Sequence, residues 1–358
     1  MEIGLNKEGI PPRMKALVAF VSFLYLPVLV PEQRILPKDE ILVSLCGYIF
    51  GPFLALIPLS YRLRCVLGSL IGVLPILVFF SNYFRAFLLG LCFSYYRTVA
   101  ELFCQALSVT AKKRSVSVLF NLINAWICFT TFFLIHFCPR VPEFAALWYV
   151  LVIGCLISAG LAAVYIIETP EEMLERFKKE KRKTEVYDEM YKVLLYINGP
   201  FAKDNEDLHE DFKDLLDRRN DSLYAPTLKE RSTAILISVN ISFVYAAVQR
   251  VLGVDNHYSL YRIFLGAMQM FSLAMTYSSG TLSFFSAAVP AVALYFVCVS
   301  TSNYNDAILV FVMALGTSFI PSEKSAYTMS PMDIVLTRSL QGLLTALLFG
   351  VITPFIYY

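Results

Sequence analysis

Charged side chains are scarce in this sequence. Asp, Glu, Lys and Arg together make up 16% of its 358 residues, whereas they make up about 25% of an average soluble domain. Apolar side chains account for 57% of the chain, with 29 Phe and 21 Tyr among them. This balance argues against a soluble globular domain and predicts a membrane protein with many spanning helices.

Residue patterns that support catalysis or metal binding are also lacking. The chain has three histidines and eight cysteines, with no CxxC pair, so neither a metal site nor a disulfide framework is predicted. No Gly-rich phosphate loop and no nucleophile with a neighbouring base stands out, which argues against ATP coupling and against an enzyme. The net charge of +2 gives no reason to expect a nucleic-acid partner. The polar start of the chain lacks the apolar core of a signal peptide, so the first apolar stretch is expected to remain as a spanning helix.

Long apolar runs, in contrast, are abundant. A helix needs about 20 apolar residues to cross a bilayer, and the candidate spans are 15–31, 41–60, 65–81, 85–107, 115–137, 144–167, 232–252, 260–277, 281–300, 307–327 and 339–358. We therefore predict an all-α polytopic membrane protein. It has a transmembrane half at 1–167, a charged cytosolic loop at 168–231 and a second transmembrane half at 232–358.

The distribution of Lys and Arg predicts which ends of the spans face the cytosol. With the N-terminus inside, the inner segments of the first half carry eight basic residues and its outer loops carry three, as the positive-inside rule requires. The interval between the halves then also lies in the cytosol. Since Thr169 can cap a helix that starts at Pro170, we expect a helix there, a break at 196–200 and an acidic helix at about 205–219. Both a solvated charged linker and a pair of short helices packed under the bundle fit this interval.

Several short strings, in order along the chain, resemble the motifs of one family. The second predicted span has Gly47, a following tyrosine and Gly51, and Arg64 comes after it. The signature between helices two and three of the major facilitator superfamily has the same residues in this register. The string from Glu168, Glu-Thr-Pro-Glu-Glu, resembles the Glu-Ser-Pro-Arg string of the sugar and organic-ion porters, and 228–248 resembles the seventh helix of the organic-ion porters. The resemblance implies a two-bundle fold whose halves alternate around a central solute site.

Other positions depart from the pattern of that family. The aspartate of the first signature is replaced by Ser60, and the acidic and basic residues seven apart at the end of helix four become Gln105 and Lys112. In the turn after the tenth span, 327–338, Arg338 is kept without a carboxylate seven residues before it. The resemblance implies that these charges form a cytosolic latch, so we expect an eroded latch and a smaller energy difference between the two states. The residues assigned to this gate are Gly47, Gly51, Arg64, Lys112, Glu168 and Arg338.

The substrate site is expected among polar side chains inside the spans, where ionisable groups are costly and usually face a cavity or a partner. Arg97 and Glu101 lie four residues apart on one helix face. They either neutralise each other or line the central cavity and sense a charged substrate or a proton. Amides and an aromatic in the fifth and seventh spans, which supply the cavity in the porters, add the candidates Asn121, Asn124, Asn240, Tyr245 and Gln249.

The sequence therefore predicts a transporter of a small organic solute, either an organic ion or a sugar-like molecule, that works by alternating access in the plasma membrane. The expected partners are the lipid bilayer, the solute and, as a candidate coupling ion, the proton; no cofactor is expected. The family has twelve spans, whereas eleven are found here. This difference and the altered latch leave two alternatives: a transport-inactive relative that serves as a membrane scaffold or receptor, and a truncated transporter copy.

Overall fold

The computed structural model describes residues 10–28, 38–78, 81–107, 145–179, 183–198 and 331–356, and isolated positions at 116, 119–120, 123, 127 and 213. The described residues form helices and connecting turns, and no strand occurs among them. The helices are α1 (Pro12–Leu24), α3 (Lys38–Leu54), α4 (Tyr61–Ile71), α5 (Leu74–Leu77), α6 (Asn82–Ala106), α8 (Ala145–Tyr165), α9 (Pro170–Lys179), α10 (Lys183–Asn198) and α16 (Pro331–Ile356).

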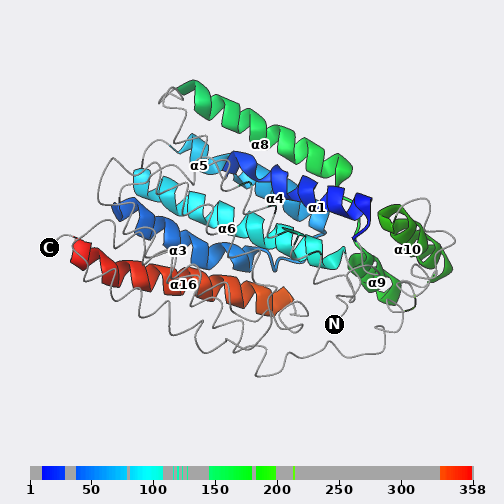
Figure 1. Cartoon of the computed structure of the whole chain (residues 1–358). Helices are drawn as coiled ribbons and strands as arrows, with labels where there is room; N and C mark the ends of the chain where they lie inside the picture. Colours follow the sequence, from blue (N-terminus) through cyan, green and yellow to red (C-terminus); the bar gives the residue numbers. More distant parts are fainter. Residues whose placement is uncertain are drawn as a thin grey trace, which may run out of the picture.

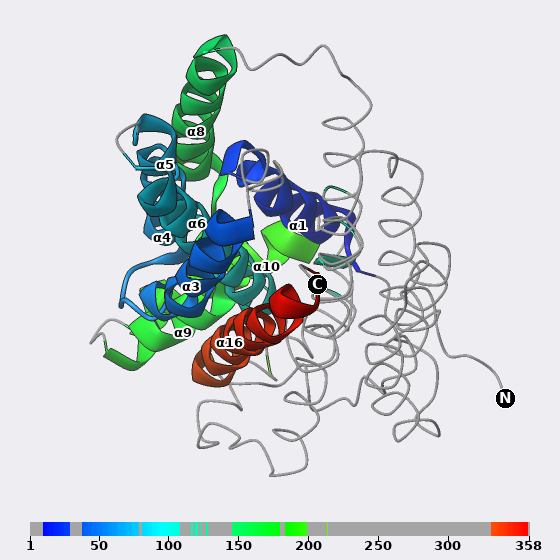
Figure 2. The same cartoon turned by 90° about the vertical axis from the view of Figure 1, so that its left-hand side faces the viewer.

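The longer helices lie side by side in one bundle (Figure 1). α6 is at the centre, with α3 and then α16 on one side, and with α4, α1 and α8 on the other (Figures 1 and 2). The short helices α9 and α10 lie at one end of the bundle, next to the starts of α4 and α1. We call this the α9 end. The starts of α1, α4 and α16 and the last turns of α6 lie together there, as expected for consecutive helices that alternate in direction.

α6 provides the core of the bundle. Its start is fixed by Ser81, whose hydroxyl accepts a hydrogen bond from Phe84 N at 3.3 Å, the usual arrangement of an N-cap. Along the helix, large side chains such as Tyr96 and Phe103 are completely buried. The ring of Tyr25 from α1 lies 5.8 Å from the ring of Tyr96, a distance typical of favourable aromatic pairs. α6 is thus surrounded by other helices and holds its polar side chains in fixed positions.

α3 and α6 touch backbone to backbone at glycines. A Cβ atom on Gly47 would lie 2.6 Å from the backbone nitrogen of Leu91, and one on Gly51 would lie 2.8 Å from that of Tyr95. Real Cβ atoms essentially never come so close, so only glycine fits at either position. The spacing of Gly47 and Gly51 is that of a small-xxx-small contact, and the structure explains this part of the signature by packing.

Several helix boundaries differ from the predicted spans: α1 and α3 each begin three residues earlier and end six or seven residues earlier than predicted, and two larger differences concern α4 and α16. The span predicted at 65–81 is divided, because α4 ends at Ile71 and the short α5 follows it. The span predicted at 339–358 begins eight residues earlier, at Pro331, and Asp333 lies in its first turn. A hydropathy window misses such a start because it counts apolar residues, whereas helix starts favour proline and acidic side chains. Arg338 therefore lies within α16 and not in a turn before it.

The predicted spans 85–107 and 144–167 correspond to α6 and α8. Within the described residues, α6 is long and apolar enough to cross a membrane. The helices Tyr149–Tyr165 and Pro170–Arg176, which meet at a bend of 59°, give a second candidate span if they are taken together as one broken helix. The number of spans and the boundaries of the three predicted domains remain predictions.

Candidate functional site

An ion pair joins α6 to α16. Arg338 Nε donates to Glu101 Oε2 at 2.8 Å, and Nη2 of the same arginine lies 2.7 Å from that oxygen. The side chain of Glu101 is 13% exposed and that of Arg338 is 18% exposed, so water screens the pair less than it would on the surface. Because α6 comes from the predicted first half and α16 from the second, this pair connects segments 237 residues apart.

The partner of Glu101 differs from the one that the sequence spacing suggested. Arg97 lies one helical turn before Glu101, but the carboxylate binds Arg338 instead. The hypothesis of a self-neutralising pair, Arg97 with Glu101, is therefore wrong. The structure also supplies an acidic partner for Arg338, although the expected latch positions at Gln105 and seven residues before Arg338 lack a carboxylate. Glu101 lies one turn before Gln105, on the same face of α6.

Arg97 is half-buried on α6. Its Nε is fully buried, and no described residue accepts a hydrogen bond from it. The hydroxyls of Ser94 and Thr98, the nearest along the helix, donate to Leu91 O at 3.2 Å and to Ser94 O at 2.8 Å, and neither accepts a hydrogen bond from this Nε. Within the described part of the chain, the Nε donor of Arg97 is thus left without an acceptor.

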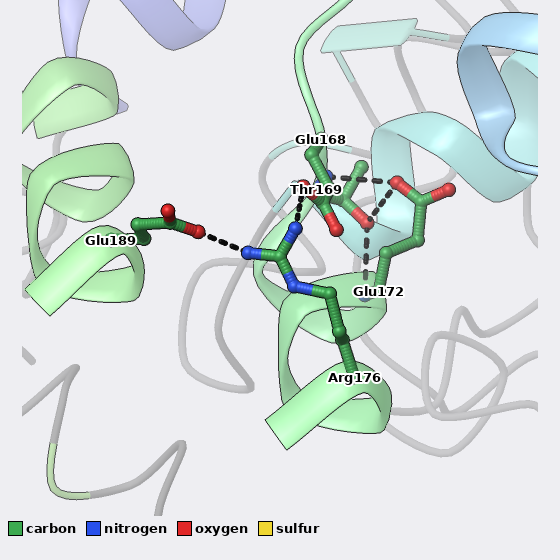
Figure 3. A network of polar contacts seen from close by, with 5 residues as sticks. All are labelled: Glu168, Thr169, Glu172, Arg176 and Glu189. Atoms are coloured by element: carbon green, nitrogen blue, oxygen red, sulfur yellow. Dashed lines mark hydrogen bonds and ion pairs between the residues drawn. The ribbon is translucent and has the colours of Figure 1, made fainter. Parts of the chain in front are cut away.

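At the α9 end, Glu172 binds the start of its own helix (Figure 3) and the start of α4. Its Oε2 accepts from Thr169 N at 2.9 Å and from Thr169 Oγ1 at 3.1 Å, and Glu172 N donates to Thr169 Oγ1 at 3.3 Å. This is a capping box, the reciprocal bonding of a Thr-x-x-Glu string, and it confirms the predicted helix start at Thr169 and Pro170. The other oxygen, Oε1, accepts from Tyr61 N at 2.7 Å, the first amide of α4.

Arg176 connects α9 to α10 (Figure 3). Its Nη1 lies 3.1 Å from Glu168 Oε2, and its Nη2 contacts Glu189 Oε2. Burial raises the pKa of the Glu168 carboxyl, an effect that the positive charge of Arg176 only partly offsets. Below these charges the two helices share a small apolar core, formed by Met173, Leu174, Val186, Met190 and Leu194. The first helix predicted for the charged interval is thus divided into two short helices, α9 and α10, that pack on each other, and α10 continues to Asn198, into the break predicted at 196–200.

Further contacts attach this pair of helices to the bundle. Arg62 Nε donates to Ile166 O at 2.8 Å, and Arg13 Nη1 donates to Tyr196 O at 3.3 Å. The guanidinium of Arg13 also lies 5.0 Å from the centre of the Tyr196 ring, a cation–π arrangement. Arg64, predicted as a gate residue, stacks in the same way on the ring of Tyr61 at 4.9 Å. We call these contacts, together with the bonds of Glu172 and Arg176, the α9 clamp.

Some predicted residues lie outside the described part of the chain. These are Lys112 of the gate, the cavity candidates Asn121, Asn124, Asn240, Tyr245 and Gln249, and the acidic helix at 205–219. The described residues contain no group of three potential metal ligands.

The sequence analysis did not predict the hydrogen bonds that the Glu172 carboxylate accepts. The Thr-x-x-Glu spacing of Thr169 and Glu172 is nevertheless the sequence signal of a capping box. No sequence signal points to Tyr61 as its second partner, because that contact joins helices far apart in the chain.

Comparison with solved structures identifies the fold. A partially occluded, inward-open structure of the xylose transporter XylE from E. coli aligns over 96% of this chain and 92% of that one, with a TM-score of 0.63 and 13% sequence identity. A structure of XylE as a major facilitator superfamily proton:xylose symporter, bound to 6-bromo-6-deoxy-D-glucose, aligns over 95% of this chain and 87% of that one, with a TM-score of 0.59 and 11% identity. No protein-family model and no curated protein matches the sequence. The predicted resemblance is thus confirmed at the level of architecture: the chain has the fold of the major facilitator superfamily transporters.

Proposed function

We propose that this protein is an integral membrane transporter of a small organic solute, and that the Glu101–Arg338 pair is a reversible contact between its two halves. The fold shared with a xylose transporter supports the general class. The observation that carries the mechanism is the ion pair itself, because it joins α6 of the first half to α16 of the second.

Alternating access requires a contact between the halves that forms in one state and breaks in the other. A charged pair suits this role, because water solvates both charges when the halves separate and so offsets most of the lost attraction. A hydrogen bond to a charged group contributes about 1.5–3 kcal/mol. One such contact therefore shifts the balance of states without locking the protein in either of them.

The basic residues near the chain start assign this contact to a side of the membrane. With the N-terminus in the cytosol, the α9 end also faces the cytosol, and Glu101 lies five residues before the end of α6 at this side. The pair then closes the inner entrance. We further propose the plasma membrane as the location, and a proton gradient as a candidate driving force.

Uptake into proteoliposomes tests the proposal. The purified full-length protein is offered sugars, organic cations and organic anions, and saturable uptake of one class is expected. Glu101→Arg should reduce this uptake strongly, because it places two like charges together, and the double variant Glu101→Arg with Arg338→Glu should restore it in part. Glu175→Arg serves as the control, because it makes the same charge change at an exposed site on α9.

Two results would contradict the proposal. If the double variant is as inactive as the single one, the pair is not a gate contact. If folded and correctly inserted protein takes up none of the solutes, a scaffold or receptor role becomes the better explanation.

A further inference from the structure

We infer that the transported solute is an organic anion and that Arg97 binds its carboxylate or phosphate group. This inference rests on the proposed function and adds the charge of the solute. A transporter of a neutral or cationic solute is compatible with the Glu101–Arg338 gate but not with this role of Arg97.

The first argument is the loss of the internal counter-ion. In sequence, Glu101 is the obvious partner of Arg97, one turn away on the same helix face. In the structure, two nitrogens of Arg338 bind Glu101 Oε2. The carboxylate is therefore committed to the contact between the halves, and the positive charge of Arg97 is not cancelled by it.

The second argument is the burial of Arg97. Its Nε is inaccessible to water and lacks an acceptor among the described residues. The hydroxyls of Ser94 and Thr98, the nearest along α6, donate to backbone carbonyls of the same helix. A buried N–H donor without an acceptor destabilises a folded protein. Its presence is readily explained if an anionic ligand supplies the missing acceptor in the working cycle.

The third argument is position. Because Arg97 and Glu101 share a face of α6, and Glu101 binds Arg338 of α16, Arg97 lies on the side of α6 that is turned toward α16. It is one helical turn farther from the α9 end than the proposed gate. A solute that passes between the halves meets Arg97 directly behind the Glu101–Arg338 contact.

The fourth argument is the chemistry of the guanidinium group. Its planar fork of N–H donors matches the two oxygens of a carboxylate or phosphate. A sugar hydroxyl leaves the charge uncompensated, and an organic cation is repelled. The same recognition serves carboxylates and phosphate esters, so the experiment must include both.

The experiment uses the full-length protein with four probes: succinate, glucose 6-phosphate, glucose and tetraethylammonium. Thermal stability in detergent reports binding, and uptake into proteoliposomes reports transport. At least one of the two anions should raise the Tm and enter the vesicles, whereas glucose and tetraethylammonium should do neither. Which anion acts decides between the carboxylate and the phosphate class.

Variants then assign the site. Arg97→Gln should raise the Tm of the ligand-free protein, because it removes a buried N–H donor that has no acceptor, and it should weaken anion binding by about tenfold or more. Arg97→Lys keeps the charge without the fork and should retain part of the binding. The matched control is Arg85→Gln, on the same helix, where the arginine donates to Asn82 Oδ1 at 3.0 Å; it should bind anions like the wild type.

Three results would overturn the inference in distinguishable ways. Uptake of glucose or tetraethylammonium in preference to both anions would leave the transporter proposal intact and refute the anionic solute. Equal anion binding by the wild type and Arg97→Gln would move the site away from Arg97. If none of the four probes binds or enters the vesicles, the inference falls together with the proposed function.

Discussion

The α9 clamp and the contact between α6 and α16 are both built from charged side chains, but they differ in construction. In the clamp, Glu172 accepts hydrogen bonds from two helix starts, and Arg176 contacts two further carboxylates. Between α6 and α16, two nitrogens of one arginine share one carboxylate oxygen. Several bonds that support one another make a joint costly to open, whereas each charged hydrogen bond between α6 and α16 contributes about 1.5–3 kcal/mol.

The packing around glycines shows the same difference. Within the predicted first half, a Cβ on Gly47 would lie 2.6 Å from the backbone of Leu91. Between the predicted halves, where α16 meets α3, a Cβ on Gly342 would lie 3.2 Å from the backbone of Tyr48. The first distance excludes any side chain, and the second requires only a small adjustment. The α3–α6 contact at Gly47 is thus closer than the α3–α16 contact at Gly342, which the proposed mechanism requires to separate.

The largest effect is expected from alanine at these glycines. Gly47→Ala should lower stability by about 1–3 kcal/mol or more, because it forces two helix backbones apart. Gly342→Ala should lower it less and should mainly shift the balance between the two states. Gly160→Ala, with nothing within 4 Å of the added Cβ, should be neutral or stabilising by up to about 1 kcal/mol. Thermal unfolding of the three purified variants and the wild type measures these differences in stability. Equal unfolding temperatures for Gly47→Ala and Gly160→Ala would contradict the close contact of α3 and α6.

A smaller effect is expected in the clamp. Glu172→Ala removes the acceptor for the amides of Thr169 and Tyr61 and should lower stability by about 1–2 kcal/mol. Glu175→Ala, at an exposed position of the same helix, should change it by no more than about 0.5 kcal/mol. If the clamp stays closed throughout the transport cycle, the fraction of Glu172→Ala that folds should transport solute at the wild-type rate per molecule. A change in rate like that of the Glu101 variants would show that the clamp also opens.

The smallest effect is expected at Glu168, and it depends on pH. Its pKa in the folded protein is raised because burial disfavours the charged form. A carboxyl with a raised pKa contributes stability below its unfolded pKa of about 4.3, and this contribution is lost as the pH rises through the folded pKa. Glu168→Gln should therefore unfold with a weaker pH dependence above about pH 4, over the range in which the folded wild-type carboxyl loses its proton. If the variant and the wild type follow the same curve, the pKa of Glu168 is not shifted on folding.

Much of the local structure was predictable, because it depends on residues close together in sequence. Thr169, Pro170 and Glu172 form a capping box with a proline at the first helical position, and these rules operate within one helical turn. The glycine spacing of Gly47 and Gly51 likewise indicated a close helix contact. The start of α16 was missed, since its first turns are too polar for a hydropathy window.

Local patterns along the chain thus determine the apolar helices, their caps and the glycines that bring α3 and α6 together, because hydropathy, capping and side-chain size act over a few residues. These local patterns could not predict which arginine binds Glu101. Arg97 is four residues away and Arg338 is 237 residues away, and spacing alone favours the nearer arginine. The packing of α16 against the α3–α6 pair reverses this choice, because a carboxylate binds the guanidinium that the fold places within hydrogen-bonding distance, however distant it is along the chain.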